Sequence, residues 1–355
     1  MNQPNPDAII IAVDGGGSKT DGVALDADGR VLAQARRPGS SPHMLELEPA
    51  VHVVDSLVTE LRARCGGRPV GQANVYISGL DLPIEVSEFT EKLAALPWAR
   101  ELAATGGLVV DNDMFALLRA GTAKRDAVAV VCGTGINCIG VREDGRRARF
   151  AALGAISGDW GGGSGLGQQA LWHAAREADG RGGRTSLTAS VPAFLGLPDV
   201  QAVIEAFHFG RLSSDVFAQL APLVLEASDQ GDEVANGILD RQAEEIVDFA
   251  VAAMTRLELE GQEVPVVLGG GVLATGNARL VAGIEQRLAM RAPGAEAILV
   301  LSRPILGGAL LALESAGGSA TALSLARDTL TTPPAPAAGQ RQEPPPGSLR
   351  ATSGT

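Results

Sequence analysis

Asp14-Gly15-Gly16-Gly17-Ser18-Lys19-Thr20 is the stretch that decides the fold. It directly follows an apolar run, Ala8 to Val13, that contains no polar side chain. Such a run ending in glycines predicts a buried strand that enters a tight turn. Consecutive glycines have no Cβ to hold a ligand away, and the N–H groups of such a turn can converge on phosphate oxygens. The stretch therefore favours phosphate binding over a hairpin without a ligand, with Lys19 adding positive charge and Asp14 able to hold Mg²⁺ through water.

Length and composition narrow the class of protein. The chain has 355 residues, 45% of them hydrophobic and 20% charged, which is enough for two domains with separate cores. The formal net charge of −12 argues against a nucleic-acid partner, because phosphate backbones are bound by a surplus of lysine and arginine. Cys65, Cys132 and Cys138 lack the spacing of a disulfide framework. With no secretory signal and no apolar run of membrane-spanning length, we expect a cytoplasmic protein without a membrane partner.

The predicted elements occur in the same order in two halves of the chain. Each half begins with three strands and continues with helices and strands, and the second half carries a large insertion at 153–234. This order predicts an α/β fold of two like domains with a cleft between them. We expect the domains at 8–113 and 114–304, with a final helix at about 305–330 that packs back on the first domain. Residues 1–7 are expected to be flexible, and the proline-rich tail at 331–355 to be disordered.

Two glycine turns occupy equivalent places in the halves. Gly133-Thr134-Gly135 follows the first strand of the second half, as the opening stretch follows the first strand of the first half. Facing each other across a cleft, two such hairpins could hold the phosphates of a nucleotide from both sides. Neither turn leads into a helix, so neither fits a Walker or a dinucleotide fingerprint. A third cluster, Gly269-Gly270-Gly271, either offers a flat surface to adenine or ribose or is an ordinary strand–helix turn.

Three acidic residues are candidates for chemistry. Asp111 and Asp113 stand where a strand ends and a helix begins, the usual ligand edge of an open α/β sheet, although carboxylates there also cap helices. Asp159 lies in a glycine-rich loop, where an acid can hydrogen-bond sugar hydroxyls. In phosphoryl transfer one carboxylate accepts the proton of the attacking hydroxyl. The four histidines lie in no nucleophile motif, and Cys132 and Cys138 are expected to be buried apolar residues.

These motifs resemble the actin-like ATPase superfamily of sugar kinases, heat-shock chaperones and actin. Within it, the chain resembles the BadF/BadG/BcrA/BcrD ATPase family, which includes N-acetylglucosamine kinase. The resemblance runs from Ile9 to about Leu313: Asp14 to Thr20 is similar to the first phosphate loop of the family and Val131 to Cys138 to the second, and Gly269 to Gly271 looks like the adenosine motif. It implies two ribonuclease-H-like domains, with ATP and Mg²⁺ bound in the cleft together with a sugar.

The same resemblance assigns roles to individual residues. Asp113, in Asn112-Asp113, matches the catalytic aspartate and would also contact the sugar, and Asp159, in Gly158-Asp159, matches the sugar-binding loop. His43 is similar to the histidine of a sugar-contacting Asn-His segment, in which Pro42 replaces the asparagine. Asn137, in the second phosphate loop, is expected to bind the sugar as well.

The resemblance implies an ATP-dependent kinase that converts an amino sugar, foremost N-acetylglucosamine, to its 6-phosphate, and a homodimer. Glucosamine, N-acetylmannosamine, a muramic acid derivative and glucose remain open as substrates. An alternative is an ATPase that activates a 2-hydroxyacyl-CoA dehydratase through an iron–sulfur cluster held by two cysteines of each subunit. Cys132 and Cys138 lie within and beside the phosphate loop, which disfavours that alternative. A sugar or nucleotide sensor without turnover is disfavoured by the two glycine turns together with Asp113.

Overall fold

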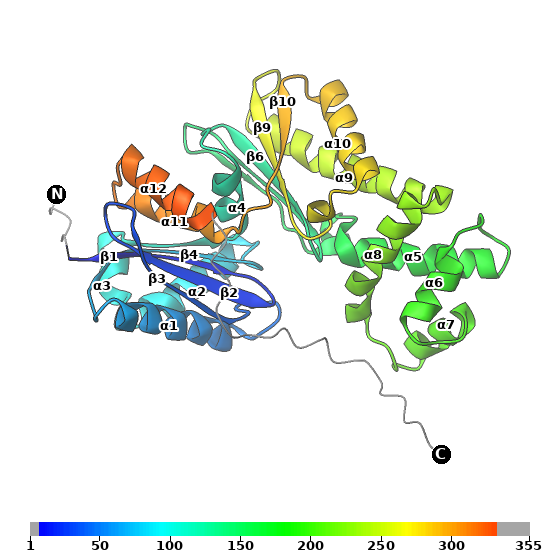
Figure 1. Ribbon diagram of the computed structural model, residues 1–355, viewed down its shortest axis with the longest axis horizontal. Helices are drawn as coiled ribbons and strands as arrows, with labels where there is room; N and C mark the ends of the chain where they lie inside the picture. Colours follow the sequence, from blue (N-terminus) through cyan, green and yellow to red (C-terminus); the bar gives the residue numbers. More distant parts are fainter. Residues whose placement is uncertain (1–6, 332–355) are drawn as a thin grey trace, which may run out of the picture.

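The structure is a computed structural model that describes residues 7–331, so the expectations for the first residues and for the tail from 332 on lie outside the described part. It contains two five-stranded sheets, each flanked by helices, and a separate group of helices that extends to one side (Figure 1). The expected α/β class is confirmed.

The first sheet has the strand order β3-β2-β1-β4-β5. Its strands are β1 (Ile9–Gly15), β2 (Lys19–Leu25), β3 (Val31–Pro38), β4 (Val70–Ile77) and β5 (Leu108–Asn112). β1 pairs with β2 antiparallel and with β4 parallel, and β4 pairs with β5 parallel. The carboxyl ends of β1, β4 and β5 therefore share one edge, where ligands of open α/β sheets bind.

Helices cover both faces of this sheet, which explains why residues 9–13 of β1 are all apolar. Side chains of Ile9, Ile11 and Val13 face α1 (Leu47–Arg64), α2 (Pro83–Ala94) and α3 (Arg100–Thr105). Ile10 and Ala12 face α11 (Ile305–Ser315) and α12 (Ala320–Thr331), which return from the far end of the chain.

The second sheet has the matching order β10-β9-β6-β7-β8. Its strands are β6 (Ala127–Cys132), β7 (Ile136–Val141), β8 (Arg147–Arg149), β9 (Val264–Gly269) and β10 (Ala295–Leu299). On one face lie α9 (Glu233–Arg256) and α10 (Ala278–Arg291), and on the other lies α4 (Met114–Gly121). The insertion contains α5 (Gly162–Ala178), α6 (Leu187–Phe194), α7 (Val200–His208) and α8 (Phe217–Asp229), with a short 3₁₀ turn, η1 (Gly154–Ser157), before α5.

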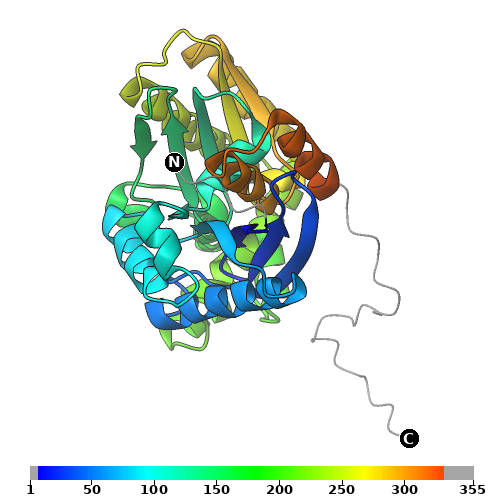
Figure 2. The ribbon, with the colours of Figure 1, turned by 90° about the vertical axis from the view of Figure 1, so that its left-hand side faces the viewer.

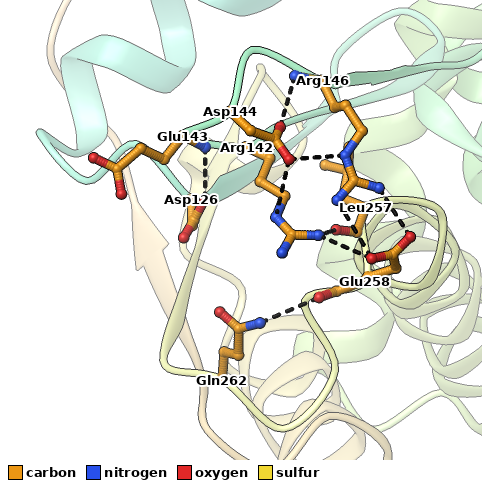
Figure 3. Close-up of polar contacts among 8 residues, drawn as sticks. All are labelled: Asp126, Arg142, Glu143, Asp144, Arg146, Leu257, Glu258 and Gln262. Carbon is orange, nitrogen blue, oxygen red and sulfur yellow. Dashed lines mark hydrogen bonds and ion pairs between the residues drawn. The ribbon is translucent and has the colours of Figure 1, made fainter.

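The hairpin between β7 and β8 is fastened to the end of α9 by a group of ion pairs (Figure 3). Arg142 donates to the carbonyl of Leu257 (2.7 Å), and Arg146 donates to Asp144 (2.9 Å) and Glu258 (2.9 Å). These side chains are largely exposed, so each pair contributes at most about 1 kcal/mol. Together they fix the orientation of β8, the strand that faces the first domain.

The two sheets are joined through α4 and α11, which cross closely in the middle of the molecule (Figure 2). Gly307 of α11 lies so near α4 that a Cβ there would approach the carbonyl oxygen of Ala116 to 1.8 Å. The adjacent Gly308 has more room, because a Cβ there would lie 3.4 Å from the ring of Tyr76. The close approach of α11 to α4 therefore depends on the glycine at position 307.

Gly307→Ala is expected to lower the free energy of unfolding by at least about 2 kcal/mol, because the two helices must move apart. Gly308→Ala is the matched control and should change stability by less than about 1 kcal/mol, since alanine also favours helix. Urea unfolding of both variants measures the difference. Equal stability of the two variants would contradict this description of the crossing.

Candidate active site

The first glycine turn joins β1 to β2 and is held by main-chain hydrogen bonds. Gly16 N–H donates to the Lys19 carbonyl (2.8 Å), and Ser40 N–H donates to the Gly16 carbonyl (3.0 Å). Gly17 and Ser18 are exposed, and their N–H groups donate to no acceptor within residues 7–331. The tip of the turn thus has free donors on a fixed backbone, as a phosphate site requires.

The second turn joins β6 to β7 and rests on the start of α5. Gly133 N–H donates to the Gly135 carbonyl (2.9 Å), while Gly163 and Ser164 at the start of α5 donate to the carbonyls of Gly133 (2.7 Å) and Thr134 (2.9 Å). In the described part of the chain, the N–H groups of Thr134 and Gly135 have no acceptor. The positive end of the α5 dipole lies directly behind this turn, which favours an anion in front of it.

Two further glycines make this close packing possible. Gly162 (φ +70°) would place a Cβ 2.4 Å from the carbonyl carbon of Gly135, and Gly270 (φ +97°) would place one 2.5 Å from the carbonyl carbon of Cys132. The third glycine cluster therefore supports the second turn from behind. Its Gly271 is exposed with open space above it, so the contact with adenine or ribose stays a prediction.

Asp14 and Asp113 are half-buried at the shared edge of the first sheet. Asp14 lies near the end of β1, and Asp113 is the residue before the first turn of α4. Burial, reinforced by the charge of Asp113, raises the pKa of Asp14 to about 8. Burial, reinforced by the charge of Asp81, raises the pKa of Asp113 to about 7. A carboxyl group with a pKa near neutrality is suited to accept a proton.

Asp21, opposite Asp14 in the β1–β2 register, has a different environment. Burial disfavours its charge, but hydrogen bonds from Arg36 (2.6 Å) and Arg303 (2.8 Å) outweigh burial and lower its pKa. Arg303 lies between β10 and α11, so this ion pair joins the start of α11 to the first sheet. We assign Asp21 a structural role.

Asp81 is central to the site, although the sequence analysis did not identify it. Its Oδ1 accepts hydrogen bonds from the amide groups of Asn112 (2.9 Å) and Asn137 (2.8 Å). Glu85 accepts the main-chain N–H of Asp81 (2.9 Å) with one oxygen and contacts His43 Nε2 (3.1 Å) with the other. Asp81 thus connects Asn112 with Asn137, and Glu85 connects His43 to the main chain of Asp81. Asp81 lies just after β4, at the same sheet edge that drew attention to Asp113, and that position was the available signal.

Two of the acidic candidates have other partners. Arg147 (2.7 Å) and Arg149 (2.6 Å) of β8 each bind one oxygen of Asp111, which joins the edge strands of the two sheets. Asp111 is therefore an interdomain contact and not a free base. Asp159 accepts hydrogen bonds from Gly154 (3.1 Å) and Ser157 (2.5 Å) of its own loop and, within residues 7–331, contacts none of the other sugar candidates. Its contact with sugar stays a prediction.

Cys132 and Cys138 are fully buried on β6 and β7, as expected for apolar core residues. Burial raises the pKa of both thiols, which disfavours the thiolates that an iron–sulfur cluster needs. Neither sulfur lies at a surface where two subunits could share a cluster. Among the described residues, no helix is long and apolar enough to cross a membrane, and no three His, Cys, Asp or Glu side chains are grouped to hold a metal ion.

Two like domains, a glycine hairpin from each and an aspartate of raised pKa at the ligand edge form the arrangement that the resemblance to actin-like ATPases implied. Residues 11–312 match the BadF/BadG/BcrA/BcrD ATPase family, and the chain belongs to this family.

Individual relatives agree with this assignment. The chain is 30% identical over 314 residues to the N-acetyl-D-glucosamine kinase of Dictyostelium discoideum, covering 86% of this chain and 98% of the relative. It is 29% identical to the N-acetylmuramic acid/N-acetylglucosamine kinase of Clostridium acetobutylicum, over 74% of this chain and 85% of that protein. The solved structure of a candidate N-acetylglucosamine kinase from Chromobacterium violaceum superposes with a TM-score of 0.67 at 26% identity, covering 87% of this chain and all of that one. The expected actin-like fold is thereby confirmed.

Proposed function

We propose that the chain is an ATP-dependent kinase of an amino sugar, foremost N-acetylglucosamine, and that it forms the 6-phosphate. The observation that carries the proposal is the position of Asp113. It combines a pKa raised to about 7 with charge interactions with Asp14, near the end of β1, and with Asp81. The names of the relatives support the choice of sugar.

In the proposed reaction the nucleotide phosphates lie between the two glycine turns. Asp113 accepts the proton of the sugar hydroxyl while its oxygen attacks the γ-phosphorus. The bond from that phosphorus to the bridging oxygen of the β-phosphate breaks, and ADP leaves. The protein mainly holds the two reactants in line and neutralises charge, as in other phosphoryl transfers. His43, Asn137 and Asp159 would bind the sugar, and Gly269 to Gly271 the adenosine.

Mg²⁺ fits this site as an ion held chiefly by water and phosphate oxygens. Asp14 offers one half-buried carboxyl group beside the first turn, and within residues 7–331 no group of three or more His, Cys, Asp or Glu side chains is arranged to hold a metal ion. Mg²⁺ typically binds through one or two carboxylates and keeps several waters. When bound, it would neutralise the charge of the phosphates.

The domain bounds, the cellular location and the oligomeric state of the protein are proposals as well. We propose domains at 8–113 and 114–304, supported by the two sheets, with α11 and α12 completing the first domain. The use of ATP and the three free cysteines support a cytoplasmic location. We also propose a homodimer, and size-exclusion chromatography with light scattering should give twice the mass of one chain.

The deciding experiment is ADP release measured with Mg²⁺, ATP and a panel of sugars. N-acetylglucosamine should stimulate release most, ahead of glucosamine, N-acetylmannosamine, N-acetylmuramic acid and glucose. Phosphorus NMR of the product should identify a 6-phosphate. No stimulation by any sugar would remove the kinase proposal.

The activity should fall in acid, because a protonated Asp113 cannot accept the hydroxyl proton. With its pKa raised to about 7, kcat/KM should decrease about tenfold for each pH unit below that value. Initial rates at low sugar concentration between pH 5 and pH 9 measure this acid limb, the decrease of kcat/KM on the acidic side of the pKa. A profile that is flat down to pH 5 would contradict the assignment of Asp113 as the base.

A further inference from the structure

One carboxylate oxygen joins the two domains beside the proposed base and the proposed sugar ligand Asn137. Oδ1 of Asp81, after β4 in the first domain, accepts a hydrogen bond from Asn112 at the end of β5 and another from Asn137 on β7 of the second domain. An ionised carboxylate accepts such bonds more strongly than a neutral group does. All three side chains are half-buried or buried, so water competes weakly for them.

Each of the two amide groups is fixed at its other end by the main chain. The side-chain oxygen of Asn112 accepts the N–H of Met114 (2.9 Å), the first residue of α4, next to Asp113. The side-chain oxygen of Asn137 accepts the N–H of Cys138 (2.6 Å), just after the second glycine turn. Through Asn112, Asp81 is therefore linked to the main chain next to the proposed base. Through Asn137, it is linked to the main chain just after the second glycine turn.

We propose that Asp81 is a positioning residue for phosphoryl transfer, which holds Asn112 and Asn137 in the orientations that align the base with the second glycine turn. This inference rests on the proposed kinase function and adds a residue to it. The reaction assigned to Asp113 needs the base and the phosphates in register within a few tenths of an ångström. They belong to different domains, and Asp81 is the acceptor that links them.

The charges around Asp81 support a role that depends on its ionisation. His43, Glu85 and Arg149 face it from the loop after β3, from α2 and from β8, and Asp113 faces it from the start of α4. Burial raises the pKa of Asp81 to about 6, with His43 and Arg149 opposing the shift and Glu85 adding to it. Asp81 is therefore ionised at neutral pH, where it raises the pKa of Asp113.

Two variants separate the charge of Asp81 from its hydrogen bonds. Asp81→Asn keeps an acceptor oxygen and removes the charge, so the acid limb of kcat/KM should move about one pH unit lower. Asp81→Ala removes both, so the KM for sugar should rise and kcat should fall, each at least about tenfold, while the KM for ATP stays within about twofold. Asp28→Asn, in the exposed turn between β2 and β3, is the matched control and should leave all these values unchanged.

Hydrogen exchange of the substrate-free protein tests the same link without activity. Asp81→Ala should exchange the main-chain amides of Met114 and Cys138 faster than the wild-type protein, with unchanged exchange in the strands of the second sheet away from Cys138. If Asp81→Ala does not fold, Asp81→Asn carries the pH and kinetic tests. Wild-type kinetics and an unmoved acid limb in Asp81→Asn, or unchanged exchange in a folded Asp81→Ala, would overturn the proposal. A wild-type protein that no sugar stimulates would instead overturn the kinase function, while the exchange result would still decide the role of Asp81.

Discussion

Asp113→Asn is expected to lower kcat for sugar phosphorylation by about 10³-fold, within the range that general-base catalysis contributes. Asparagine has nearly the same shape and still accepts a hydrogen bond, but it cannot take up the proton of the attacking hydroxyl. The KM for ATP should change by less than about threefold, because Asp113 lies outside both glycine turns. Steady-state kinetics at pH 8, where the wild-type base is ionised, measure both constants.

The control for this prediction is again Asp28→Asn, which makes the same chemical change on an exposed turn of the same domain. It should retain wild-type kcat. If Asp113→Asn kept more than about a tenth of wild-type kcat, another group would be the base, and Asp81 would be the next to test, because its pKa is also raised.

Gly162→Ala is expected to raise the Kd for ATP at least about tenfold and to reduce stability by about 1–3 kcal/mol. Its positive φ is unfavourable for alanine, and the added Cβ would overlap the main chain of Gly135. Either the second turn or the start of α5 must move, and the free N–H groups at the turn then lose their alignment. Nucleotide titration by calorimetry and thermal unfolding measure the two effects.

The same helix contains a matched control at Gly165, where a Cβ would meet nothing within 4 Å. Gly165→Ala should bind ATP normally and gain up to about 1 kcal/mol of stability, because alanine favours helix over glycine. Similar ATP binding by the two alanine variants would mean that the second turn does not depend on its support by α5.

The sequence predicted most of the fold because its signals are local. Apolar runs that end in glycines predict β1 and β6. Because the same order of strands and helices follows each run, the sequence also predicts two like domains. The glycine-rich stretch from Ser157 to Gly167 predicts a single turn in the sequence, but α5 already begins at Gly162. Glycine disfavours helix, but the carbonyls of Gly133 and Thr134 accept the first N–H groups of α5 and hold it there. The short helix α3 was missed as well.

The candidate site was harder to predict, because its decisive contacts join residues that are distant in the chain. Asp111 and Asp113 are equivalent in residue type and position at the end of a strand, and only the resemblance favours Asp113 in the sequence. The two arginines of β8 that bind Asp111 become visible only in the structure. Asp81 was overlooked for the same reason: its partner Asn137 is 56 positions away and belongs to the other domain. A strand end can be read from local sequence, whereas the partner of a side chain across a cleft cannot.

The return of α11 and α12 to the first sheet has a consequence for biosynthesis. One face of β1 and β2 stays uncovered until residues 305–326 have left the ribosome, because the apolar side chains that cover it come from there. The second sheet and its helices, residues 127–299, are complete before that point. Domains usually fold in the order of translation. In this chain the domain that is synthesised first should be the one that finishes folding last, and its exposed face is where a chaperone would act on the nascent chain.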